Sequence, residues 1–325
     1  MSQNLTLEFS ENEILPLLFG EHSAHLKYIE NKTGVSISDR GNTLTLSGTK
    51  REVKTAQTIL DILQNKIHAG HEVGTAEIDA ALRFLDSGTT KPTKKKAAAL
   101  GDERLAIKTK KKTIIPRSPN QAAYIEAIIN HEMVFGLGPA GTGKTYLAVA
   151  MAVSMYLSGE VERLIFCRPA VEAGEQLGFL PGDMKDKVDP YLRPIYDALH
   201  DMLPADFTQA KIEAGDIEIA PLAFMRGRTL SNAFVLVDEA QNTTTTQMKM
   251  LLTRLGESSR MVVNGDMSQI DLPRGAKSGL RDAVEVLDGI KDIPFMRFEK
   301  ADVTRHALVG KIIDAYDKQK HKEND

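Results

Sequence analysis

The 325-residue sequence contains one cysteine and no tryptophan. The lone thiol, Cys167, has no partner for an internal disulfide, which favours a reducing compartment. No apolar run approaches the roughly 18 residues that a membrane-spanning helix needs. Residues 1–5 lack the basic and apolar regions of a signal peptide. We therefore expect a cytoplasmic protein that has no membrane partner.

The bulk composition is that of an ordinary globular protein, with 42% hydrophobic and 26% charged residues, and the length predicts about two domains. The net charge of −3 argues against a chain that coats nucleic acid, but the charge is unevenly spread. Between Lys91 and Arg117, ten Lys and Arg residues stand against only Asp102 and Glu103. We expect residues 87–114 to form a basic linker, either a solvated tether or an electrostatic track for a phosphate backbone.

Residues 1–86 predict a small α+β domain. Apolar periodicity indicates three strands and three helices, in the chain order 5–9 (strand), 11–19 (helix), 25–30 (helix), 35–38 (strand), 43–46 (strand) and 52–67 (helix). This order is that of a KH domain, in which a GXXG loop between the first two helices clamps a nucleic-acid backbone. The corresponding loop here has Gly20, but Ser23 stands in place of the second glycine. RNA binding and protein docking both remain open for this KH-like domain.

The most specific motif spans residues 138–145 and matches the phosphate-loop pattern G-x-x-x-x-G-K-(S/T). An apolar segment at 133–137 predicts a strand before it, and residues 146–153 predict a helix after it. In that context glycines turn backbone N–H groups toward a phosphate, and the helix N-terminus adds its positive dipole end. Lys144 is expected to reach the β- and γ-phosphates of ATP, and the Thr145 hydroxyl to ligate Mg²⁺. The predicted nucleotide-binding residues are Gln121, Gly138, Pro139, Ala140, Gly141, Thr142, Gly143, Lys144, Thr145 and Tyr146.

Strands and helices alternate after residue 115. The predicted strands are 133–137, 163–167, 216–220, 233–237, 260–264 and 295–299. Near-continuous apolar strands that are separated by helices predict a doubly wound, mostly parallel α/β sheet, here a P-loop NTPase core of the RecA type over residues 115–318 with a tail at 319–325. Ligands of such sheets bind at the carboxyl ends of the strands.

Two further strand ends complete the predicted site. The strand 233–237 is followed by Asp238, expected to help hold Mg²⁺, and by Glu239, expected to activate water as a general base. Gln269 follows the next strand and is expected to sense the γ-phosphate or the attacking water. Gln121 precedes a predicted helix, and its amide can read the adenine edge. These residues predict ATP hydrolysis in addition to ATP binding.

Together the motifs resemble a PhoH-family ATPase, a single-core relative of superfamily 1 helicases. The resemblance covers residues 115–318 and includes Gln121 and the segments 138–145, 168–175, 178–182, 224–229, 238–242, 265–269 and 302–306. It implies ATP hydrolysis coupled to RNA, a ring-shaped homo-oligomer that we expect to be a hexamer, and a role in rRNA maturation or decay beside an endoribonuclease. In the helicase pattern, Arg168 begins a loop that touches the nucleic-acid backbone.

A superfamily 1 helicase places its nucleotide between two tandem cores, whereas this chain has length for one. The arginine that stabilises transition-state charge is therefore expected to come from a neighbouring subunit. Arg305 is the first candidate, followed by Arg281, Arg226 and Arg228. Because few aromatic side chains are present to stack on bases, we expect binding of single-stranded RNA with little sequence preference.

Two other functions remain open. An ATP-gated assembly adaptor would dock a protein through the KH-like domain and would hydrolyse ATP slowly without RNA. A P-loop kinase would phosphorylate a small molecule, but Glu239 and Gln269 fit the activation of water better than transfer to a substrate.

Overall fold

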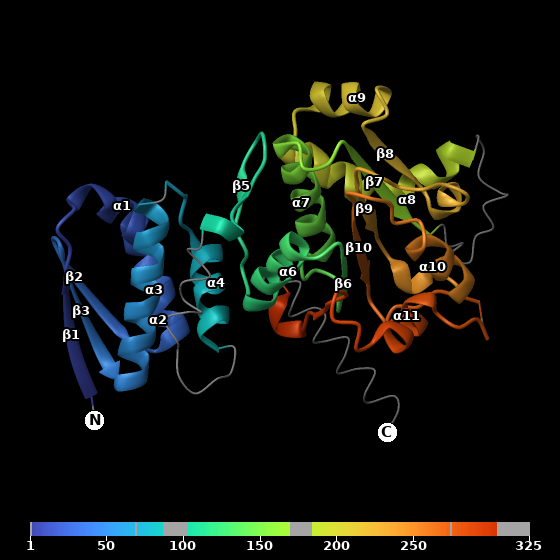
Figure 1. Cartoon of the computed structure of the whole chain (residues 1–325). Helices are drawn as coiled ribbons and strands as arrows, with labels where there is room; N and C mark the ends of the chain where they lie inside the picture. The colour runs from blue at the N-terminus through green and yellow to red at the C-terminus, as the bar shows by residue number, and fades with distance from the viewer. Residues whose placement is uncertain (1, 69, 87–102, 170–183, 274, 304–325) are drawn as a thin grey trace. The chain divides into compact units, whose positions relative to one another are not determined.

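The computed structural model describes residues 2–68, 70–86, 103–169, 184–273 and 275–303 (Figure 1). The chain folds into two compact units. The first consists of Met1–Ala106 and Ile115–Ala122, and the second of Ile107–Ile114 and Ala123–Asp325. Within the described ranges, the helices are all too short or too polar to cross a lipid bilayer.

The first unit combines an antiparallel sheet with packed helices. The sheet joins β1 (Ser2–Glu8), β3 (Thr43–Thr49) and β2 (Ser36–Arg40) in that spatial order. Along the chain, α1 (Leu15–Phe19) and α2 (Ala24–Thr33) follow β1, whereas α3 (Lys50–His68) and α4 (Thr75–Asp86) follow β3. α3 packs on the sheet through an apolar face at helical spacing, which includes Val53, Ala56, Ile59, Leu60 and Leu63. The predicted order of strands and helices is confirmed, and the likeness to a KH domain stays a prediction.

The turn between α1 and α2 contains the residues that were compared above with a GXXG loop. Gly20 has a φ of 73°, and a Cβ there would lie 2.8 Å from the His25 ring. His22 and Ser23 also adopt left-handed backbones, with φ values of 50° and 58°. Glycine takes up this conformation at less cost than other residues. Ser23 therefore retains the backbone conformation that a second glycine would favour, and its hydroxyl donates to Asp39 at 2.9 Å.

The structure differs from the predicted linker at its C-terminal end. Residues 87–102 lie outside the described residues, but β4 (Ile107–Lys108) and β5 (Thr113–Ile114) pair as an antiparallel hairpin that groups with the second unit. Ile107 and Ile114 are opposite each other in the hairpin, and both are buried. These two buried side chains anchor the hairpin. The lysines of the same segment had suggested a solvated tether.

The second unit is built on a parallel sheet. In the described part of this unit, six strands lie in the order β11-β6-β10-β9-β7-β8, and every neighbouring pair is parallel. The strands are β6 (Met133–Leu137), β7 (Arg163–Arg168), β8 (Ile217–Pro221), β9 (Ala233–Val237), β10 (Arg260–Gly265) and β11 (Phe295–Arg297). β6 and β9 are buried at every residue, as their continuous apolar sequences indicate. The predicted mostly parallel α/β core is confirmed.

Helices connect the parallel strands and return the chain to the same sheet edge. These connections contain α7 (Lys144–Ser158), α8 (Met184–Met202), α9 (Ala205–Glu213), α10 (Thr245–Leu252) and α11 (Gly279–Leu287), while α6 (Pro119–Asn130) leads into the first strand, β6. Because the strands are parallel, the carboxyl ends of β6, β7, β9 and β10 all lie at one edge. The polar residues that follow these strands are thereby brought together.

Gly279 permits a close approach between α11 and the segment that follows the acidic strand end. A Cβ at this position would clash with the Thr244 carbonyl oxygen and lie 2.7 Å from Met248 Cβ. Replacing Gly279 with alanine is therefore expected to destabilise the second unit by about 1–3 kcal/mol, the usual cost of overpacking, and to lower Tm in thermal unfolding. Gly74→Ala is the matched control, since its Cβ would meet Glu77 at an ordinary 3.5 Å. Equal shifts of Tm in the two variants would contradict this packing argument.

Candidate functional site

The phosphate-loop motif lies between the end of β6 and the start of α7. Gly138 has a φ of 145°, and a Cβ there would lie 2.5 Å from the Phe298 carbonyl oxygen. The loop can therefore begin here only with glycine. Gly143 takes a left-handed backbone with a φ of 86° directly before Lys144, the first residue of α7. The motif thus places its backbone N–H groups at the N-terminus of a helix, an arrangement that favours anions.

Lys144 is only 8% exposed, and its amine is folded back onto the loop. Nζ donates to the carbonyl oxygens of Gly138 at 2.6 Å and Pro139 at 2.9 Å. Burial lowers the pKa of Lys144, and nearby carboxylates, Asp238 first among them, oppose that shift. Charged oxygens bind an ammonium more strongly than carbonyl oxygens do. We therefore expect a bound phosphate to displace the loop carbonyls from this amine.

Thr145 and Asp238 join the phosphate loop to the end of β9. Thr145 Oγ1 donates to Asp238 Oδ1 at 2.8 Å. Burial raises the pKa of the Asp238 carboxyl, as does the neighbouring charge of Glu239, while the Thr145 hydrogen bond and Arg168 oppose the shift. A hydroxyl and a carboxylate oxygen are thus held together where the loop meets the sheet.

These two side chains fit a Mg²⁺ ion that is shared with a nucleotide. Among the residues that the structure describes, no cluster of three or more His, Cys, Asp and Glu side chains is arranged to hold a metal ion. Mg²⁺ at nucleotide sites keeps several waters and binds one or two protein oxygens plus the substrate phosphates. Thr145 and Asp238 supply oxygen ligands of that kind and number.

Glu239 is held in a strained backbone conformation by two neighbours. Its φ of 52° lies in the left-handed region, which residues other than glycine populate sparsely. Gln241 Nε2 donates to Glu239 Oε2 at 2.5 Å, and Arg168 Nη2 lies 3.4 Å from Oε1. Strain of this kind persists where surrounding contacts fix it, and it concentrates at functional sites. Both carboxylate oxygens of the predicted general base therefore have protein partners.

Gln241 also connects the ends of β9 and β10. Its Oε1 accepts a hydrogen bond from the Asp266 backbone N–H at 3.0 Å. Asp266 Oδ1 accepts from the backbone N–H and the hydroxyl of Ser268, which fixes the turn that leads to Gln269. Asp266 Oδ2 is buried and has no hydrogen-bond partner among the described residues. A bound water or ligand would satisfy this oxygen.

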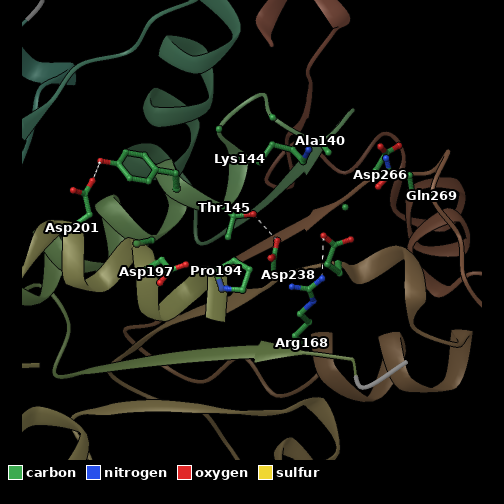
Figure 2. A pocket seen from close by; sticks show the side chains of 16 residues that line it. Ala140, Lys144, Thr145, Arg168, Pro194, Asp197, Asp201, Asp238, Asp266 and Gln269 are labelled. Atoms are coloured by element: carbon green, nitrogen blue, oxygen red, sulfur yellow. Dashed lines mark hydrogen bonds and ion pairs between the residues drawn. The ribbon is translucent and has the colours of Figure 1, made fainter. Parts of the chain in front are cut away.

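One pocket of about 590 Å³ gathers the strand ends and the phosphate loop, a volume within the range of small-molecule sites (Figure 2). The predicted site residues that line it are Ala140, Gly141, Gly143, Lys144, Thr145, Tyr146, Asp238, Glu239 and Gln269. With Arg168, four residues between 194 and 201, and Gly265 and Asp266, the pocket lining comes from five separate parts of the sequence.

Part of the pocket wall is formed by α8, and the sequence did not predict that residues of this segment line the site. Pro194, Asp197, Ala198 and Asp201 line the pocket and share one face of this helix. Their spacing of three, four and seven residues is a local signal that they share one face of a helix. Which neighbour that face meets depends on the packing of α8 against α7, for which the sequence gives no local signal.

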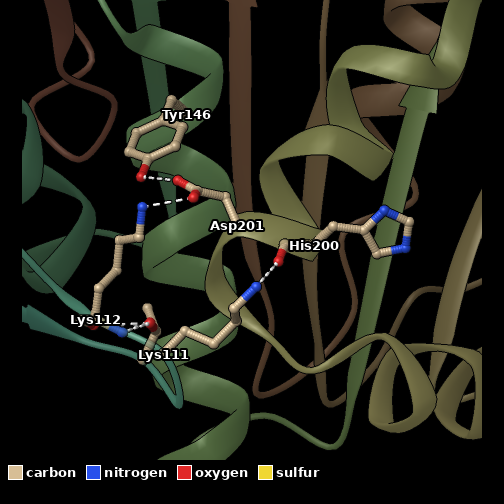
Figure 3. Close-up of polar contacts among 6 residues, drawn as sticks. Lys111, Lys112, Tyr146, His200 and Asp201 are labelled. Atoms are coloured by element: carbon tan, nitrogen blue, oxygen red, sulfur yellow. Dashed lines mark hydrogen bonds and ion pairs between the residues drawn. The ribbon is translucent and has the colours of Figure 1, made fainter.

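Asp201 of α8 joins Tyr146 of the phosphate-loop helix to Lys112 of the β4–β5 hairpin (Figure 3). The Tyr146 hydroxyl donates to Asp201 Oδ2 at 2.6 Å, and Lys112 Nζ contacts Asp201 Oδ1 at 2.5 Å. The hydrogen bond from Lys112, and next that from Tyr146, lowers the pKa of Asp201. Lys111 Nζ donates to the His200 carbonyl oxygen at 2.6 Å. Two lysines of the predicted basic linker are therefore engaged with α8.

The described residues that line the pocket do not include Gln121, Gly138, Pro139 or Thr142. Thr142 Oγ1 donates to the Pro139 carbonyl oxygen inside the loop, so these two residues shape the loop itself. Gln121 is 4% exposed, and its Oε1 accepts from the Arg117 backbone N–H at 2.6 Å. That amide oxygen is thus used at the start of α6. Arg305, the first candidate for a transition-state arginine, lies outside the described residues.

Comparison with known proteins identifies the family of this chain. Residues 113–317 match the family model described as PhoH-like protein. The chain is 49% identical over 302 residues to a PhoH-like protein of Bacillus subtilis (strain 168), covering 93% of each chain. It is 47% identical over 205 residues to Protein PhoH of Escherichia coli (strain K12), covering 62% of this chain and 58% of that one. The solved Pif1 helicase of Candida albicans aligns with 57% of this chain and 40% of its own at 13% identity and a TM-score of 0.31, too low to define a common fold. By the family match and these identities, the chain belongs to the PhoH-like protein family.

Proposed function

We propose that this chain is a Mg²⁺-dependent ATPase whose hydrolysis of ATP is coupled to RNA. The observation that carries the proposal is the convergence of the phosphate loop, the Thr145–Asp238 pair and Glu239 in one pocket. A phosphate loop alone would support nucleotide binding only. A second carboxylate beside the metal ligands adds a base for water, which is the requirement for hydrolysis.

Each residue has a separate task in this proposal. The loop N–H groups and Lys144 bind the β- and γ-phosphates, and Thr145 and Asp238 would hold Mg²⁺, which neutralises phosphate charge. Gln269 orients the attacking water through its amide. Glu239 takes a proton from that water while the water oxygen forms a bond to the γ-phosphorus. The bond from the γ-phosphorus to the bridging oxygen breaks, and ADP departs with that electron pair.

Single-stranded RNA is the proposed partner because residues 91–96 contain four lysines, a charge density that attracts a phosphate backbone. The KH-like order of elements in the first unit supports the same partner. A cytoplasmic ring of six identical subunits and an endoribonuclease as protein partner complete the proposal. The ring is supported by the presence of a single core in each chain.

The test is ATP turnover with and without single-stranded RNA across a series of salt concentrations. We expect RNA to raise turnover and salt to weaken that effect, because backbone contacts release counterions. Replacing Lys94, Lys95 and Lys96 with alanine is expected to reduce RNA stimulation and to leave RNA-free turnover unchanged. Alanine at Lys249, Lys291 and Lys300 is the control for an equal loss of charge. A wild-type chain that hydrolyses no ATP would refute the proposed activity, and slow turnover that ignores RNA at every salt concentration would favour the ATP-gated adaptor.

A further inference from the structure

The nucleotide pocket is lined by more negative than positive side chains. Its cations are Lys144 and Arg168, and its carboxylates are Asp197, Asp201, Asp238, Glu239 and Asp266. A triphosphate adds further negative charge, of which one Mg²⁺ offsets only part. Repulsion between like charges is strong in a partly buried cavity. Binding and hydrolysis of ATP in this pocket therefore depend heavily on the few cations that line it.

Arg168 is placed at the reacting end of the pocket. It is the last residue of β7, and β7 pairs with β9, whose carboxyl end carries Asp238 and Glu239. Its side chain is 21% exposed, and Figure 2 shows it directed from the end of β7 toward Asp238. The family resemblance predicted a contact between this position and a nucleic-acid backbone. That contact stays a prediction, and the structure places the Arg168 side chain among the residues that line the nucleotide pocket.

Both pocket cations contact protein oxygens in this structure. Lys144 donates to two loop carbonyls, and Arg168 lies 3.4 Å from Glu239 Oε1. That distance is longer than the roughly 2.7–2.9 Å of a strong charge-assisted hydrogen bond. A terminal phosphate offers a guanidinium two oxygens in a matching geometry. The γ-phosphate is therefore a stronger partner for Arg168 than Glu239 is.

The other candidate arginines in the described residues are placed elsewhere. Arg226 and Arg281 are exposed, and neither lines the pocket. Arg228 donates through both terminal nitrogens to Glu218, at 2.6 and 2.7 Å. Among the described residues that line the pocket, Arg168 is the arginine that can reach a phosphate without help from another subunit.

We propose that Arg168 is a catalytic residue that exchanges Glu239 for the γ-phosphate of ATP bound in the same chain. The exchange places positive charge where negative charge develops in the transition state. It also releases Oε1 of Glu239 to accept the proton of the attacking water. Arg168 donates hydrogen bonds and transfers no proton, so the balance of the hydrolysis step is unchanged. This inference rests on the ATPase function proposed above. It assigns a transition-state arginine to the chain that binds the ATP, where the sequence predicted one from a neighbouring subunit.

The test compares ligands with and without a γ-phosphate. For the full chain and its Arg168→Ala variant, kcat for ATP hydrolysis is measured together with the equilibrium affinities for AMPPNP and ADP. We expect kcat to fall about 10³-fold, the low end of the effect of such an arginine. The affinity for AMPPNP is expected to fall about tenfold, the value of one charge-assisted hydrogen bond, while the affinity for ADP stays the same. Arg168→Lys keeps the charge without the fork and should give intermediate values.

The control is Arg163→Ala, which removes the same charge at the opposite end of β7, where Nη2 donates to the Ser231 carbonyl oxygen. Its kcat and its affinities should match the wild type. Equal losses of AMPPNP and ADP affinity in Arg168→Ala, or an unchanged kcat, would overturn the proposal. Unchanged ADP affinity also reports that the variant is folded. If the alanine variant does not fold, kcat and the two affinities are compared in Arg168→Lys. Because the binding comparison needs no turnover, an inactive wild type would refute the ATPase function and the catalytic role, while the affinities for AMPPNP and ADP would still decide whether Arg168 contacts the γ-phosphate.

Discussion

Replacing Glu239 with glutamine is expected to lower kcat for ATP hydrolysis about 10²- to 10⁴-fold, the range that a positioned general base contributes. Glutamine keeps the shape of the side chain and an oxygen that can accept from Gln241, but it takes no proton from water. The affinity for ATP is expected to persist because the phosphate loop and the Thr145–Asp238 pair are unchanged. Steady-state turnover and equilibrium binding of ATP would measure the two effects separately.

Glu257→Gln is the matched control for this experiment. Glu257 is exposed, and its backbone carbonyl, not its carboxylate, accepts the hydrogen bond from Asn232. Its replacement should leave turnover unchanged. Full turnover in Glu239→Gln would contradict the role of Glu239 as a base and would revive a kinase, in which a substrate hydroxyl takes the place of water.

Replacing Asp238 with asparagine is expected to separate stability from activity. Burial raises the pKa of this carboxyl in the folded chain, so between its ordinary value and the raised value the folded state binds more protons than the unfolded state. The free energy of unfolding therefore falls as pH rises through that window, and the buried carboxylate charge destabilises the fold at neutral pH. Asparagine removes the charge, and we expect a Tm no lower than that of the wild type without nucleotide. Hydrolysis is expected to fall about 10³-fold because Mg²⁺ would lose the carboxylate ligand proposed for it.

The same raised pKa predicts a pH effect of opposite sign on metal binding. Below that pKa the Asp238 carboxyl is protonated and is a poor ligand. The Mg²⁺ concentration for half-maximal turnover is therefore expected to rise as pH falls. Thermal unfolding at several pH values, combined with Mg²⁺ titrations of turnover, would check both signs. A neutral-pH Tm of Asp238→Asn well below that of the wild type would argue that the carboxylate stabilises the fold.

The parallel sheet and the phosphate loop could be predicted because their signals are local. β6 and β9 are apolar and buried along their whole length, and the motif at 138–145 constrains a short stretch of backbone. Asp238 and Glu239 directly follow β9, so the common edge of a parallel sheet brings them to the loop. The β4–β5 hairpin gives no such signal, because two buried isoleucines separated by polar residues form no period.

The roles of α8 and Arg168 depend on tertiary contacts and could not be read from local patterns. Asp201 binds Tyr146 only because α8 packs against α7. Gln121 has an amide that suits adenine, but its Oε1 accepts the backbone N–H of Arg117, a local hydrogen bond that the residue type alone does not specify. Arg168 reaches Glu239 because β7 pairs with β9, and strand order is a property of the whole sheet.

Strand order also has a consequence for synthesis of the chain. The hydrogen bonds of β6 in the sheet are made to β10 and β11, which come from the last third of the sequence. Tyr124 and Asn264 bond across 140 residues, and Thr145 and Asp238 across 93. Contacts of such long separation form slowly, because loop closure must precede them. A nascent chain therefore carries the complete phosphate-loop motif long before it has a nucleotide pocket, and a bound nucleotide can stabilise only the finished sheet.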